Sequence, residues 1–123
     1  MNNPIEINVK TRFLAEESTQ NKTRYAFSYQ ISITNTGTET VRLLTRYWKI
    51  TDGNNSVKEV HGDGVIGEQP FIAAGDSFEY ISGAALDTQV GSMTGSYQMV
   101  TNSGHCFDAY IPTFKLAAPL AVH

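Results

Sequence analysis

The chain has 123 residues, of which 41% are hydrophobic and 17% are charged, and this composition is typical of a globular protein with a single domain. Its formal net charge of −3 provides no electrostatic footprint for nucleic acid, so no nucleic-acid partner is expected. No apolar run approaches the ~18 residues of a membrane span, and the N-terminus has no secretory pattern, so no membrane association is expected.

Alternating apolar and polar residues predict the first strands of the chain. The alternation is clearest over residues 25–34 and recurs more loosely over residues 5–13, so both segments should be half-buried strands of an antiparallel sheet. A turn at residues 35–38 leads into a third strand over 41–51, which contains the only tryptophan. Two consecutive leucines at 43–44 interrupt its alternation, as a β-bulge would.

The second half of the chain continues as short strands separated by turns. The expected strands cover residues 57–61, 78–81, 93–99 and 107–116, with turns at 52–55, 74–76 and 102–104 and a polar excursion over 82–91. Pro112 lacks a backbone donor, so its strand should lie at a sheet edge or contain a bulge. No segment carries a sustained helical period, and no helix beyond about two turns is expected.

Seven to eight short antiparallel strands predict an all-β, immunoglobulin or fibronectin type III-like β-sandwich formed by one domain, residues 1–123. Trp48 lies on the third strand, where these sandwiches bury a tryptophan. Tyr97 precedes Met99 by two residues, as the corner tyrosine of such folds precedes a core residue. A closed barrel with the same number of strands is the alternative.

The segment Gly62-Asp63-Gly64-Val65-Ile66-Gly67 has the G-x-G-x-x-G spacing of dinucleotide-binding proteins. Pro70 and Gly75 prevent the helix whose N-terminus would hold a pyrophosphate, so NAD or ATP binding in the Rossmann manner is not expected. The glycines could instead expose backbone N–H groups to phosphate, with Arg46 as a possible anion contact. Alternatively, they serve only to permit positive φ angles and close packing.

Two further features of this region bear on binding. Val65 and Ile66 could anchor a protein partner if their side chains are exposed at the loop tip, or they could fold under it. Arg42, Arg46 and Lys49 form a cluster of basic residues in the sequence that could meet an anion, although such charges are more often the solvated face of a strand.

The candidate metal ligands are few, and no pair of them has a diagnostic spacing, so no metal site and no cofactor are expected. They are His61, Asp63, Glu68, His105, Cys106, Asp108 and His123. Cys106 is the single cysteine, which fits a reducing compartment and predicts a cytoplasmic protein. We expect it to be a buried small hydrophobe, since no adjacent base identifies it as a nucleophile. No catalytic residue is assigned, and the protein is not expected to be an enzyme.

Several motifs together resemble the bacterial ApaG (CorD) proteins over nearly the whole chain. They are Arg46-Tyr47-Trp48, residues 62–70, Ser82-Gly83, residues 91–99 and Ile111-Pro112-Thr113-Phe114, while Ala74 departs from the proline frequent in the family. The resemblance implies a fibronectin type III-like fold, an association with cobalt tolerance and magnesium efflux, and no catalytic activity. Related domains in eukaryotic F-box and polymerase-interacting proteins imply a binding module.

The resulting hypothesis is a small, non-enzymatic, cytoplasmic interaction domain. Its partner is expected to be another protein, and a second copy of the chain forming a homodimer is also open. The alternative hypothesis is an anion-binding protein that holds phosphate or pyrophosphate through the Gly62–Gly67 loop.

Overall fold

The computed structural model describes residues 4–18 and 24–119, which form eight strands and one 3₁₀ helix. The elements are β1 (Ile5–Phe13), η1 (Ala15–Glu17), β2 (Tyr25–Asn35), β3 (Val41–Asp52), β4 (Val57–Asp63), β5 (Phe71–Ile72), β6 (Ser77–Leu86), β7 (Val90–Thr101) and β8 (Cys106–Ala117). Strands dominate as predicted, and the one helix of the described residues has only three residues. Within the same ranges, no helix is long and apolar enough to cross a membrane.

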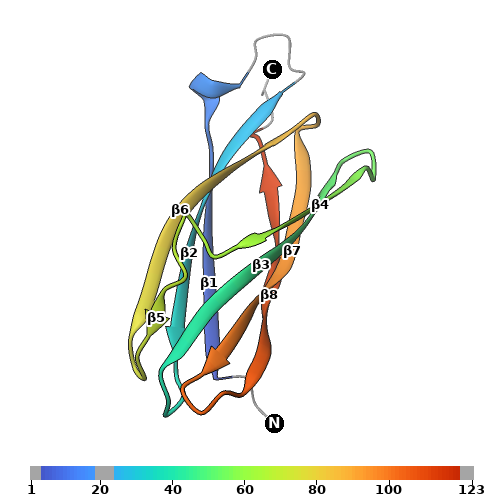
Figure 1. Ribbon diagram of the computed structural model, residues 1–123. Helices are drawn as coiled ribbons and strands as arrows, with labels where there is room; N and C mark the ends of the chain where they lie inside the picture. Colours follow the sequence, from blue (N-terminus) through green and yellow to red (C-terminus); the bar gives the residue numbers. More distant parts are fainter. Residues whose placement is uncertain (1–3, 19–23, 120–123) are drawn as a thin grey trace.

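The strands form two antiparallel sheets packed face to face as a sandwich (Figure 1). One sheet has the order β1-β2-β6, and the other has the order β4-β3-β7-β8, with β5 paired to the end of β3. This arrangement, in which the third strand joins the late hairpin and β6 returns beside β2, is that of a fibronectin type III-like domain. The closed-barrel alternative is wrong, because no ladder joins the two sheets in the described part of the chain.

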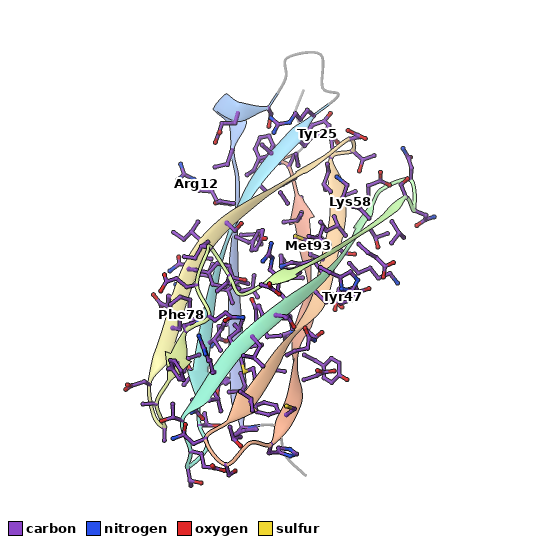
Figure 2. The ribbon with its side chains drawn as sticks, in the orientation of Figure 1. Arg12, Tyr25, Tyr47, Lys58, Phe78 and Met93 are labelled. Atoms are coloured by element: carbon purple, nitrogen blue, oxygen red, sulfur yellow. The ribbon has the colours of Figure 1, made fainter. Side chains whose placement is uncertain are left out.

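The register of the three-stranded sheet follows from the alternation in β2. Ile31 lies opposite Val9 of β1 and opposite Tyr80 of β6, so all three side chains point into the interior. A shift by one residue would turn this whole apolar set toward water, which fixes the pairing. Figure 2 shows the same division of side chains in both sheets: Met93 of β7 lies in the interior, whereas Arg12 of β1 and Lys58 of β4 point outward.

Trp48 is the centre of an aromatic cluster between the sheets, and its side chain is only 3% exposed. Its ring makes edge contacts with Tyr29, Phe114 and Tyr97, at centroid distances of 5.4, 5.9 and 6.4 Å. Such tilted arrangements add to the energy of apolar burial because the positive ring edge meets a negative ring face. The prediction that Trp48 is buried is confirmed.

Two irregularities expected from the sequence are present. The β3–β7 register shifts between Leu43 and Thr45, which leaves Leu44 as the bulged residue. The β7–β8 register shifts between Met93 and Gly95, opposite the segment that contains Pro112. β8 is also an edge strand, so Pro112 satisfies both conditions under which a strand tolerates proline.

Two segments differ from the sequence-based expectation. The polar excursion over residues 82–91 was wrong in its first half, because β6 continues through Ser82 and Gly83 to Leu86. Pairing with β2 supplies the backbone hydrogen bonds that outweigh the poor strand propensity of these small residues. The short strand β5, which pairs with the first residues of β3, is absent from the strands expected from the sequence.

Candidate functional site

The glycine-rich segment begins where the bulge in β3 redirects a carbonyl group. The Leu44 carbonyl accepts hydrogen bonds from the Gly64 N–H at 2.8 Å and from Gln69 Nε2 at 2.9 Å. A bulged residue leaves the regular ladder, so its carbonyl is available to a neighbouring loop. Leu44 therefore fixes both ends of the connection between β4 and β5. This connection crosses from β4 and lies beside β6 (Figure 1).

The tip of this connection is a two-residue hairpin over Val65–Glu68. The Val65 N–H donates to the Glu68 carbonyl at 2.8 Å, and the Glu68 N–H donates back to the Val65 carbonyl at 2.9 Å. The two central residues, Ile66 and Gly67, have φ angles of 43° and 79°. Two positive φ angles define a type I′ turn, in which asparagine and glycine are the usual residues.

Val65 and Ile66 point in opposite directions from this hairpin. Val65 is 1% exposed and belongs to the core, so of the two alternatives it is folded under the loop and is not an exposed contact. It lines the same pocket as Trp48 and Tyr80. Ile66 is 55% exposed at the tip, and it is the one of the two that is available to a partner.

Two of the glycines have specific structural roles. Gly64 has a φ of 61°, and a Cβ added there would lie 2.0 Å from the Glu68 carbonyl oxygen, so it meets the predicted need for a positive φ and close packing. A Cβ at Gly62 would lie 2.7 Å from the Arg46 guanidinium, which therefore rests directly on the Gly62 backbone. Substitution of Gly62 would displace that side chain.

Arg46 contacts the glycine segment, but as a donor to its carbonyl groups. Its Nη1 donates to the carbonyl oxygens of Asp63 and Gly64, both at 3.0 Å. The Gly64 and Val65 N–H groups are already bonded to Leu44 and Glu68. An anion nest of consecutive free N–H groups is therefore not formed at these two residues, and the backbone mode of phosphate binding finds no support here.

The three basic residues grouped in the sequence do not share one surface role. The Arg42 guanidinium stacks over the Phe71 ring at 4.6 Å from its centroid, and Arg42 Nε donates to the Gln69 carbonyl at 3.1 Å. Lys49 is exposed on β3. Arg46 alone of the three reaches under the hairpin, so the site depends on one cation and not on a basic patch.

A pair of buried tyrosines lies behind the hairpin and joins the two sheets. The hydroxyl groups of Tyr80 on β6 and Tyr97 on β7 are hydrogen-bonded at 2.5 Å, and both side chains are buried. Tyr97 was expected to resemble a corner tyrosine, but its hydroxyl pairs with this second phenol. No sequence pattern predicts this contact, because the two residues lie on strands of different sheets.

Alkaline pH should destabilise the fold through this pair. Burial raises the pKa of Tyr80 and Tyr97 above the ordinary value of 10.0, while the nearby Arg46 opposes the shift. The unfolded chain therefore loses these protons first, so the stabilisation is complete below pH 10 and declines as pH rises beyond it. Above pH 10, the free energy of unfolding measured with urea should fall by about 1.4 kcal/mol per pH unit for each of the two tyrosines.

The same titration has a matched control. Tyr97→Phe should reduce the slope above pH 10, whereas Tyr110→Phe removes an exposed phenol of β8 and should leave the slope unchanged. A stability that stays constant up to pH 11 in the wild-type protein would contradict the role assigned to burial.

The candidate metal ligands remain dispersed in the part of the chain that the structure describes. Within residues 4–18 and 24–119, no three histidine, cysteine, aspartate or glutamate side chains are placed to hold an ion together. His123 lies outside the described residues. Cys106 is exposed at the start of β8, so the expectation that it is a buried hydrophobe is wrong. It begins an edge strand, where alternate side chains face water.

Comparison with known proteins identifies the family of this fibronectin type III-like domain. The sequence profile of the ApaG domain matches residues 15–101. The chain is 53% identical to Protein ApaG of Thiobacillus denitrificans and 50% identical to Protein ApaG of Azoarcus sp., over 97% of this chain and 94% of each relative. The chain therefore belongs to the ApaG family, as its motifs indicated.

Solved structures agree with the fold. A crystal structure of a Bordetella pertussis protein superposes with a TM-score of 0.91 at 41% identity, covering 95% of both chains. A second X-ray structure, of a structural-genomics target, also gives a TM-score of 0.91 at 43% identity, covering 98% of this chain and 91% of that one. The two-sheet sandwich is thus shared with these relatives.

Proposed function

We propose that this ApaG domain is a non-enzymatic cytoplasmic module that binds another protein through the hairpin at Ile66. The observation that carries the proposal is the backbone of Ile66, which has a φ of 43° while its side chain is 55% exposed. A β-branched residue in this region costs roughly 1–3 kcal/mol. Asparagine or glycine would fit the turn without that cost. A contact between the isoleucine side chain and a protein partner explains why isoleucine is present instead.

The surroundings of Ile66 suit a protein contact. The hairpin is held by backbone hydrogen bonds at both ends, so the side chain is presented without much loss of freedom on binding. The same connection continues into Phe71, which is 65% exposed and lies under the Arg42 guanidinium. Aromatic and arginine side chains are enriched among the residues that dominate binding energy at interfaces.

Replacing Ile66 by asparagine should separate stability from binding. Ile66→Asn should raise the free energy of unfolding by about 1 kcal/mol, because asparagine accepts a positive φ, and it should weaken partner binding at least about tenfold. Val57→Asn is the matched control, since Val57 is similarly exposed on β4. It should gain no stability and bind the partner as the wild type does.

The binding measurement needs an identified partner. A photoreactive residue at position 66 would be used to crosslink neighbours in living cells, and the protein captured would be purified and titrated against each variant. Equal affinities of the wild type and Ile66→Asn would overturn the proposed contact. A failure of Ile66→Asn to gain stability would overturn the argument from backbone strain.

We propose that the association of the family with cobalt tolerance and magnesium efflux depends on the partner bound at Ile66. In a bacterial strain that lacks its own ApaG, expression of the wild-type chain should restore growth in cobalt, and Ile66→Asn should not. Val57→Asn should restore it. Complementation by Ile66→Asn equal to that of wild type would separate the cobalt phenotype from this surface.

A further inference from the structure

A small pocket lies beneath the Ile66–Gly67 turn, between the hairpin and β6. Its volume is about 220 Å³, and its lining comes from both sheets and from the turn itself. The side chains that the argument uses are Tyr29, Arg46, Trp48, Tyr80 and Ser82. Val65, Ile66 and Gly67 of the glycine segment also line it, and the polar groups used below belong to side chains.

The Arg46 guanidinium is held in place by hydrogen bonds that use only some of its N–H groups. Nη1 uses its hydrogens on the Asp63 and Gly64 carbonyls, and the group rests on the Gly62 backbone. A guanidinium has five N–H donors in a fixed fork, so Nη2 and Nε still carry three. Such a planar fork is suited to the oxygens of phosphate or carboxylate groups.

Buried phenols supply further donors to the same space. Tyr29 is 5% exposed, and its hydroxyl has no hydrogen-bond partner among the described residues. Tyr97 does not line the pocket and is fully buried, so its O–H is satisfied when it donates to the Tyr80 oxygen. The Tyr80 O–H is then free to donate into the pocket, which it lines.

The charge of the lining has one sign. Among the described residues that line this pocket, Arg46 is the only charged one, and none carries a carboxylate. Burial raises the pKa of Tyr80, and Arg46 opposes that shift from close by, so the phenol remains a neutral donor at physiological pH. A set of partly buried donors around one cation is unfavourable to a cationic ligand and is complementary to an acceptor.

We propose that this pocket binds a compact oxyanion, with inorganic phosphate or the phosphate group of a small metabolite as the ligand class. Arg46 would supply the charge and two hydrogen bonds, and Tyr29, Tyr80 and Ser82 would supply hydroxyl donors. The volume lies below the roughly 300–1,000 Å³ of sites for drug-sized ligands, so it accommodates a single anionic group and not a nucleotide. The proposal is independent of partner binding at Ile66.

The single tryptophan makes the pocket observable, since Trp48 is part of the lining. The purified protein would be titrated with sodium phosphate at constant ionic strength in chloride, and Trp48 fluorescence and amide NMR shifts would be followed. A saturable change is expected in the wild type. Arg46→Gln should weaken phosphate binding at least about tenfold, because it removes the charge and the charge-assisted hydrogen bonds of the guanidinium.

The variants are chosen so that misfolding does not imitate loss of binding. Tyr29→Phe removes only a hydroxyl and should also weaken binding, and Gly62→Ala keeps the Arg46 charge but displaces its fork. Arg42→Gln removes a cation of the same strand that does not line the pocket, and it should bind as the wild type does. Thermal unfolding without phosphate identifies any variant that has lost its fold.

Three ligands distinguish the sources of the anion. Inorganic phosphate, phenyl phosphate and acetate would be compared, and tighter binding of the monoester would assign the site to a metabolite phosphate, whereas tighter binding of inorganic phosphate would assign it to the free ion. No saturable response to either phosphate would overturn the proposal. So would equal losses in Arg46→Gln and Arg42→Gln, or unchanged binding in both Tyr29→Phe and Arg46→Gln.

Discussion

Trp48→Ala is expected to lower the free energy of unfolding by about 3–5 kcal/mol, the cost of removing a large aromatic side chain from a packed core. The indole is enclosed by rings from both sheets, namely Tyr29 on β2, Tyr97 on β7 and Phe114 on β8. No neighbouring side chain can move into the space without leaving its own sheet position, so the cavity should persist. Urea unfolding followed by circular dichroism measures the loss.

Phe71→Ala is the control for this prediction. Phe71 is an aromatic residue on β5 that is 65% exposed, and its main partner is the Arg42 guanidinium. Its removal should cost about 1 kcal/mol or less, the usual value of an exposed cation–π contact. Similar small losses in both variants would show that the aromatic cluster does not hold the sheets together.

Val65→Asp is expected to destabilise the protein by about 3 kcal/mol or more, because it places a carboxylate in a space now filled by a 1% exposed valine. The loss should be smaller at low pH, where the buried carboxyl group is protonated and neutral. Ile66→Asp changes the neighbouring residue in the same way at an exposed position. It should keep stability within about 1 kcal/mol of wild type.

These two variants test the directions of the hairpin side chains. A stable Val65→Asp protein together with a destabilised Ile66→Asp protein would mean that the hairpin faces the other way. Chemical denaturation at pH 7 and at pH 4 provides both measurements on the same samples.

The sequence predicted those features of the fold that depend on local rules within a single strand. The alternation in β2, the leucine pair at the bulge and the position of Pro112 each reflect a local backbone rule, and the structure has all three. Trp48 could be placed in the core because it lies within a strongly apolar strand. The sandwich fold could be predicted because these strand patterns are local.

The candidate site could be predicted only in part, because it depends on contacts between elements that are distant in the sequence. The direction of Val65 is set by the Leu44 carbonyl, which fixes Gly64, and no period in the sequence encodes that bond. The contact between Tyr80 and Tyr97 joins two sheets. Arg46 was recognised as a candidate, but its place beneath the turn depends on the missing side chain of Gly62.

The sheet order also has a consequence for how the chain folds during synthesis. β2 pairs with β6 from Tyr25, opposite Leu86, to Thr34, opposite Ser77, so this ladder closes only after β3, β4 and β5 have been made. Such distant pairings require loop closure before any contact is gained, and sandwiches dominated by them fold in milliseconds to seconds. On the ribosome, β1 and β2 can form a hairpin early, but that hairpin keeps an open apolar edge until β6 emerges.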